Sequence, residues 1–126
     1  MNAIKPQVKL YGTRPEMAIV HAVVCSVFNK YGIDCVITSG VGMKHGDKSL
    51  HPVGLAHDYR TKHINNDVIK QQIIDDMKKV LPCCDIILEY DGAPQEHLHV
   101  EFDDHNDHDY QLDKKAYKDS GEWPKK

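Results

Sequence analysis

The segment SLHPVGLAHD, which runs from Ser49 to Asp58, restricts most strongly how this chain can fold. Pro52 has no backbone amide hydrogen and Gly54 favours irregular backbone, so a regular helix cannot pass through the segment. We therefore expect a turn that carries His51, followed by a strand that carries Asp58. The segment offers an imidazole and a carboxylate, two of the side-chain types that bind metal ions in proteins.

A second polar run, EHLH, follows further along the chain and contains Glu96, His97 and His99. Because side chains alternate along a strand, both histidines are expected on one face of the sheet, and either can supply a ligand. With His51 and Asp58, one of these histidines completes the three protein ligands of a catalytic zinc site. Glu96, just after a turn, is then expected to act as the general base.

Two stretches carry apolar residues at the three- and four-residue spacing of an amphipathic helix. The first begins with a capping sequence at Thr13 and ends at Gly32, and the second is capped within residues 65–67 and ends at Pro82. The residues expected to be buried are Met17, Val20, Val24, Val27 and Phe28 in the first helix and Ile69, Ile73, Met77, Val80 and Leu81 in the second.

Short runs of β-forming residues predict the strands. They cover residues 33–38, 56–59, 85–90 and 98–102, the last two forming a hairpin, with a brief strand over 7–11. The glycine-rich residues 41–52 are expected to form a loop. This order predicts an α+β fold in which helices flank a small antiparallel sheet. Residues 1–102 are expected to form a single domain, and residues 103–126 a solvated polar tail.

The composition argues against several classes of protein. The net charge is -3, 28% of the residues are charged, and the basic residues are scattered, so no nucleic-acid partner is expected. No segment is apolar over the length of a membrane span, and the N-terminus has no signal-peptide pattern. None of the four cysteines lies in a C-x-x-C pair, so they are expected to be reduced thiols in the core.

Several other polar residues are expected to have structural roles. His21 and Cys25 lie within the first helix, where packing in the core is expected for both. His57 alternates away from the neighbouring carboxylate along its strand, so either a structural role or an exposed position is expected for it. Glu101 shares a strand face with His99, so we expect a hydrogen bond between this carboxylate and the imidazole.

The first segment matches the signature S-x-H-x-x-G-x-A-x-D at positions 49, 51, 54, 56 and 58. In this signature the chain resembles the M15 family of zinc peptidases, and residues 96–99 supply the family's second element, an acid three residues before a histidine. The family contains D-alanyl-D-alanine carboxypeptidases and dipeptidases and phage L-alanyl-D-glutamate endolysins, and its fold is similar to that of the hedgehog signalling domain. The resemblance spans residues 33–102 and is greatest to small phage-encoded members.

The resemblance implies that His51, Asp58 and His99 hold one zinc ion and that Glu96 is the general base. His99 is the preferred third ligand because it alone has an acid three residues before it. His97 is then expected beside the zinc, as a catalytic residue that donates a hydrogen bond to the oxyanion; the alternative is a residue that only supports the metal ligands. The residues expected to contact substrate are Ser49, Lys44 and His45.

One feature of the family pattern is missing. Many relatives carry an arginine shortly after the Ser-Gly pair of the strand that precedes the substrate loop, and it steadies the developing oxyanion. Here Val41 and Gly42 follow that pair. Lys44, His45 or His97 is expected to supply the positive charge in its place.

The resemblance therefore predicts a zinc metallopeptidase, of carboxypeptidase or endolysin type, that hydrolyses a peptide bond in peptidoglycan stem peptides. The alternative is a catalytically weak or inactive zinc-binding module of the same fold, for example a virion component. Such a phage protein is expected to be made in the host cytoplasm and to act at the cell wall after lysis or from a virion.

Overall fold

The computed structural model describes residues 2–6, 8, 10, 15–40, 55–102, 115 and 119. Within these residues the chain is an α+β protein with two helices and one mixed five-stranded sheet. The predicted α+β class is confirmed. The expected loop over 41–52 and the expected tail over 103–126 lie outside the described residues, apart from single positions in the tail.

The two helices begin and end close to the predicted residues. Helix α1 covers Pro15–Lys30, and all five of its predicted apolar residues are buried. Helix α2 covers Asp67–Val80, and the Asn66 side chain caps it by accepting hydrogen bonds from the amides of Val68 and Ile69, at 2.9 and 3.1 Å. The prediction for Val80 is wrong, because this side chain is 53% exposed at the end of the helix.

The sheet has the strand order β1-β2-β3-β5-β4. Its strands are β1 Ala3–Ile4, β2 Val36–Ser39, β3 Ala56–Arg60, β4 Cys84–Glu89 and β5 His97–Phe102. The expectation of a wholly antiparallel sheet is wrong, since β1 pairs with β2 in parallel. The amide of Ala3 donates a hydrogen bond to the carbonyl of Cys35 at 2.9 Å, and Ala3–Ile4 form a strand that the sequence did not predict. Of the strand expected over 7–11, only residues 8 and 10 are described, and neither lies in a strand.

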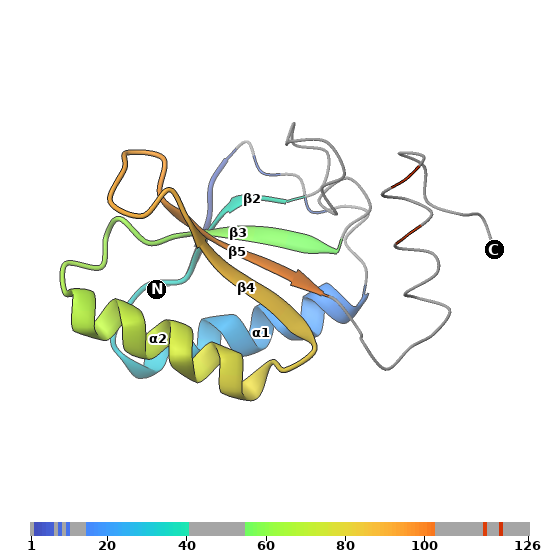
Figure 1. Cartoon of the computed structure of the whole chain (residues 1–126), viewed down its shortest axis with the longest axis horizontal. Helices are drawn as coiled ribbons and strands as arrows, with labels where there is room; N and C mark the ends of the chain where they lie inside the picture. Colours follow the sequence, from blue (N-terminus) through green and yellow to red (C-terminus); the bar gives the residue numbers. More distant parts are fainter. Residues whose placement is uncertain are drawn as a thin grey trace.

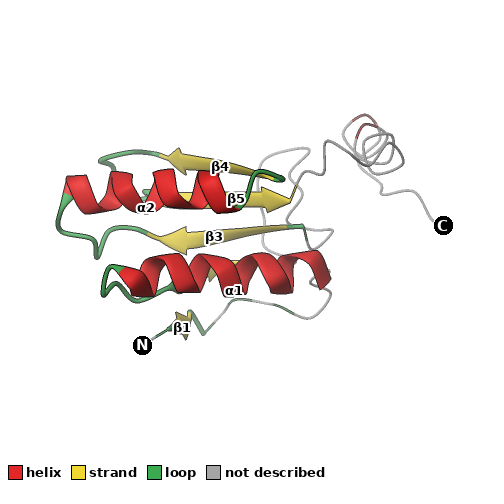
Figure 2. Cartoon of the chain, turned by 90° about the horizontal axis from the view of Figure 1, so that it is seen from below, coloured by secondary structure: helices red, strands yellow, loops and turns green. Residues whose placement is uncertain are grey.

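Both helices cover the same face of the sheet, as Figures 1 and 2 show from two directions. The core lies between these layers and includes Phe28 from α1, Met77 from α2, and Tyr59 and Leu98 from the sheet. Among the described residues, no helix covers the opposite face, which we call the open face. Residues that alternate away from the core along β3, β4 and β5 therefore project from the open face.

Candidate metal site on the open face

The register of three adjacent strands brings polar residues together on the open face. Asp58 in β3 pairs with His99 in β5, and Arg60 pairs with His97. In the neighbouring pair, Glu89 in β4 lies opposite His97. Directly opposite residues project from the same face of a sheet, so three strands contribute to one group of side chains. We call Asp58, Glu89, His97 and His99 the open-face cluster.

The shortest contact within the open-face cluster joins His99 and Asp58. Nδ1 of His99 lies 2.9 Å from Oδ1 of Asp58 and 3.7 Å from Oε1 of Glu89. Nε2 of His97 lies 3.2 Å from the same Glu89 oxygen and 3.7 Å from Oδ2 of Asp58. Asp58 is buried, whereas the Glu89 side chain is 40% exposed, so the cluster is reached from the open face.

The surroundings of His99 favour a positive charge. Burial by itself lowers the pKa of this imidazole, but hydrogen bonds with Asp58 and Glu101 outweigh it and raise the pKa to about 9. Nε2 of His99 lies 3.5 Å from Oε1 of Glu101, so the predicted contact between these two residues is confirmed. A site that stabilises an imidazolium in this way also attracts a metal cation, which would replace the proton.

Asp58, Glu89 and His99 each offer one ligand atom, and these atoms all lie within 4.8 Å of one another. Carboxylate oxygen and imidazole nitrogen are among the ligands that Zn²⁺ takes in proteins. Glu101 at the second nitrogen of His99 provides the outer partner that metal-binding histidines typically have. Asp58 and His99, two predicted ligands, together with Glu89, which was not predicted, could therefore hold a metal ion.

The structure does not bring the Glu96 carboxylate into the open-face cluster. Glu96 directly precedes β5, and its carboxylate contacts α2 and the turn after β4. Glu96 is buried and accepts hydrogen bonds from the Thr61 hydroxyl, from Lys70 Nζ at 3.1 Å and from the Gly92 amide at 3.0 Å. Burial alone would raise its pKa, but these bonds lower it to about 2. A carboxylate this acidic is a weak proton acceptor, and its predicted role as general base stays a prediction.

Glu89 is the member of the open-face cluster that the sequence did not reveal. It reaches the site because the turn after β4 sets a register in which Glu89 lies across from His97. The predicted hairpin was the sequence feature that could have indicated Glu89, since residues near the ends of two paired strands lie opposite each other. To identify the residue opposite His97 in the hairpin, the exact length of the turn must be known, and the sequence does not determine it.

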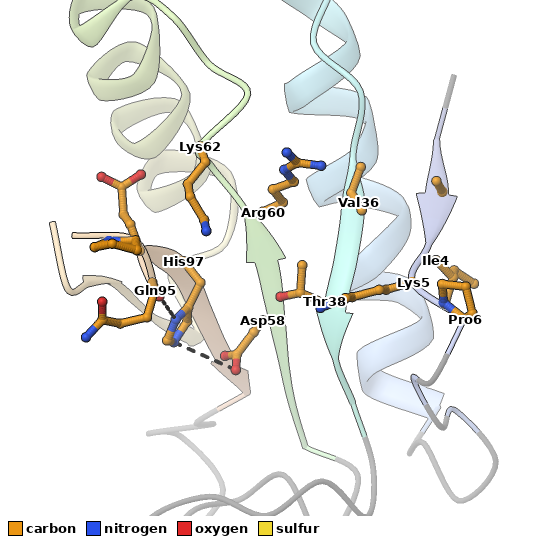
Figure 3. A pocket seen from close by; sticks show the side chains of 13 residues that line it. Ile4, Lys5, Pro6, Val36, Thr38, Asp58, Arg60, Lys62, Gln95 and His97 are labelled. Carbon is orange, nitrogen blue, oxygen red and sulfur yellow. Dashed lines mark hydrogen bonds and ion pairs between the residues drawn. The ribbon is translucent and has the colours of Figure 1, made fainter. Parts of the chain in front are cut away.

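A pocket of about 580 Å³ adjoins the open-face cluster, and Asp58 and His97 point toward one another at its wall (Figure 3). Lys5, Arg60 and Lys62 also line it. Within the part of the chain that the structure describes, no ion pair joins any of these three cations to a carboxylate. The pocket therefore offers positive charge to a ligand.

Four residues of the predicted site lie outside the described residues. They are the predicted ligand His51 and the predicted substrate contacts Lys44, His45 and Ser49. Of the predicted ligands, Asp58 and His99 are described and adjacent, and His97 lies beside them.

Comparison of the chain with protein-family models, with curated proteins and with solved structures finds no match. Among the described residues, no helix has both the length and the apolar character that crossing a membrane requires.

Proposed function

We propose that this protein is a zinc-dependent peptidase that hydrolyses a peptide bond in the stem peptides of bacterial peptidoglycan, with a fold of the hedgehog and D-alanyl-D-alanine peptidase type. The observation that carries the proposal is the contact of His99 with Asp58 beside His97 and Glu89, at the wall of a cationic pocket. These residues supply metal ligands, proton-transfer groups and a place for an anionic substrate on one face of the sheet.

Asp58 and His99 would hold the metal ion together with His51, the third ligand that the sequence predicts. A bound zinc ion supplies Lewis-acid polarisation of the scissile carbonyl and lowers the pKa of water. Glu101 orients the His99 imidazole through its second ring nitrogen.

His97 and Glu89 are the proton-transfer groups best placed for this reaction. Nδ1 of His97 lies 3.0 Å from the Gln95 carbonyl oxygen, which accepts a hydrogen bond from it, while Nε2 faces Glu89 and Asp58. These contacts hold the imidazole at the pocket wall, where it can donate a hydrogen bond to the oxyanion of the reacting carbonyl. Glu89 orients this imidazole and is exposed enough to accept a proton from water.

The substrate class follows from the charge of the pocket. Peptidoglycan stem peptides carry free carboxylates, and Lys5, Arg60 and Lys62 supply positive charges next to Asp58 and His97. Arg60 lies opposite His97 in the sheet, so a cation stands close to the reacting groups although the family's usual arginine is missing. Such cations can orient a substrate carboxylate through charge-assisted hydrogen bonds.

A zinc-binding module without catalytic activity is the second candidate. The observation that favours it is the ion pair of Glu96 with Lys70, because a carboxylate engaged by three donors is not available as the family's base. In this case the open-face cluster would still bind metal, but stem peptides would remain intact.

Digestion of purified peptidoglycan and of synthetic stem peptides, followed by mass spectrometry of the products, separates these candidates. We expect the zinc-loaded protein to release D-alanine or to cut within the stem, and Asp58→Asn to lose this activity. Asp91→Asn, which changes an exposed aspartate in the hairpin turn, is the matched control and should retain it. If the peptides remain intact after prolonged digestion with the zinc-loaded protein, the result contradicts the proposed peptidase activity and favours the zinc-binding module.

A further inference from the structure

A second group of ligand-type side chains lies on the helix-covered side of the sheet. His21 and Cys25 are one turn apart on α1, and Cys35 directly precedes β2. One nitrogen of His21 and the two sulfur atoms all lie within 4.8 Å of one another. Both cysteines are buried, and His21 is partly buried. We call His21, Cys25 and Cys35 the helix-side cluster.

The spacing within the helix-side cluster is close to that of a zinc site. Sγ of Cys25 lies 3.5 Å from Nε2 of His21. With Zn–S bonds of about 2.3 Å and Zn–N bonds of about 2.1 Å, sulfur and nitrogen ligands of a tetrahedral site lie about 3.6 Å apart. This pair already has that separation, and Sγ of Cys35 lies within 4.8 Å of both atoms.

Tyr59 orients the His21 imidazole from the other side. The Tyr59 hydroxyl lies 3.0 Å from Nδ1 of His21 and 3.3 Å from Nδ1 of His57, and the Tyr59 and His21 rings are stacked. When Nδ1 of His21 donates to this hydroxyl, Nε2 carries the lone pair and is the ring nitrogen nearer to Cys25 Sγ, at 3.5 Å against 3.8 Å for Nδ1. A polar partner at the remote ring nitrogen is what fixes metal-binding histidines in position.

The protonation states of the helix-side cluster suit uptake of a cation. Burial lowers the pKa of His21, so the imidazole is neutral at neutral pH, the form that binds metals. Burial and the Cys25 thiol raise the pKa of the Cys35 thiol, so this thiol is uncharged until a cation enters. A metal ion deprotonates a coordinating thiol outright and so offsets the cost of burying a thiolate.

We propose that His21, Cys25 and Cys35 form a second metal site that binds Zn²⁺ through one imidazole and two thiolates and fastens α1 to the beginning of β2. Binding releases the two thiol protons to solvent, so the cluster carries no net charge once it holds the ion. A donor set of two sulfur atoms and one nitrogen selects Zn²⁺ over Mg²⁺ or Ca²⁺. The site is separate from the open-face cluster, because Asp58 and Tyr59 are successive residues of β3 whose side chains project from opposite faces.

Titration of the reduced, metal-free wild-type chain with Co²⁺, a spectroscopic substitute for Zn²⁺, tests this proposal. We expect a thiolate-to-cobalt charge-transfer band in the near ultraviolet, which the oxygen and nitrogen donors of the open-face cluster cannot produce. The band should disappear in Cys25→Ser and in Cys35→Ser. It should be unchanged in Cys83→Ser, the matched control outside the cluster.

Thermal unfolding gives a second readout that does not depend on cobalt. Added Zn²⁺ should raise the Tm of Asp58→Asn, whose open-face site is disabled, and this rise should disappear when Cys25→Ser is added. A wild-type chain that shows no thiolate band at saturating Co²⁺ would overturn the proposal and identify the two thiols as ordinary core packing. A band that survives in both folded cysteine variants would overturn it equally.

Discussion

Nδ1 of His99 lies 2.9 Å from Oδ1 of Asp58 across the antiparallel pair of β3 and β5. The two residues are direct partners in the sheet, so backbone hydrogen bonds fix their relative position without the help of any loop. Glu101, two residues after His99 on the same face, contacts the other ring nitrogen. The sheet therefore presents an oriented imidazole and a buried carboxylate as a rigid pair, as a metal site requires.

Replacing His97 by alanine should lower peptidase activity with little loss of zinc. His97 lies beside Asp58 but is not required as a ligand, and its loss removes one donor to the oxyanion. We expect kcat to fall by about a hundredfold, the usual cost of one such donor. Elemental analysis and stem-peptide kinetics on the same preparation measure both properties. His63→Ala, which removes a histidine bonded to the Asp34 carbonyl away from the cluster, should change neither.

Glu89→Gln and Glu96→Gln should have opposite effects on activity and stability. Glu89 contacts His97 and is 40% exposed, so its amide variant should remain stable and lose most of its turnover. Glu96 accepts three hydrogen bonds on the helix side, so its variant should lose about 2 kcal/mol of unfolding free energy. Denaturant unfolding and stem-peptide kinetics measure the two effects. A stable, inactive Glu96→Gln would instead support Glu96 as the general base.

Acid should destabilise the wild-type protein through Glu96. Its pKa is about 2 in the folded chain against an ordinary value of 4.5, so the folded state holds the ionised form more strongly than the unfolded state does. The stabilisation of the folded state by the ionised Glu96 carboxylate is fully present above pH 4.5 and is lost as the pH falls toward 2. The difference in unfolding free energy between wild type and Glu96→Gln should therefore shrink over this range. A difference that stays constant would show that the carboxylate charge does not stabilise the fold.

Removing the cations of the pocket should weaken substrate binding more than turnover. Arg60→Ala and Lys62→Ala each remove a positive charge from the pocket wall. We expect KM for stem peptides to rise about tenfold in each variant, which corresponds to a loss of about 1.4 kcal/mol of binding free energy. For substrates with amidated carboxylates, KM should not change when these cations are removed. Lys78→Ala, in the last turn of α2, is the matched control. An unchanged KM in both pocket variants would contradict a role for these cations.

Local rules predicted much of this fold, and their limits are visible at particular residues. Helical spacing predicted the buried face of α1, and strand alternation predicted that His97 and His99 share a face. Glu96 is expected to lean toward the metal from the turn, but it precedes β5 and its carboxylate bonds to Lys70 of α2. Its attachment to Lys70 and Gly92 is a tertiary contact that no local pattern contains.

Three further features also depend on long-range contacts. Glu89 reaches His97 only through the register of the hairpin. Ala3 joins the sheet by pairing in parallel with Val36, and nothing in the first residues of the chain identifies that partner. His21, Cys25 and Cys35 were expected to pack in the core, but their convergence requires α1 to lie against the beginning of β2.

Zinc content tests the central claim most directly. Every chain in the comparison should carry Cys25→Ser, so that the helix-side cluster contributes no metal. We expect about one zinc ion per chain in this parent, and loss of most of it when Asp58→Asn or His99→Ala is added. Asp91→Asn in the same parent should keep its zinc. Full zinc content in folded Asp58→Asn and His99→Ala chains would contradict a metal site on the open face.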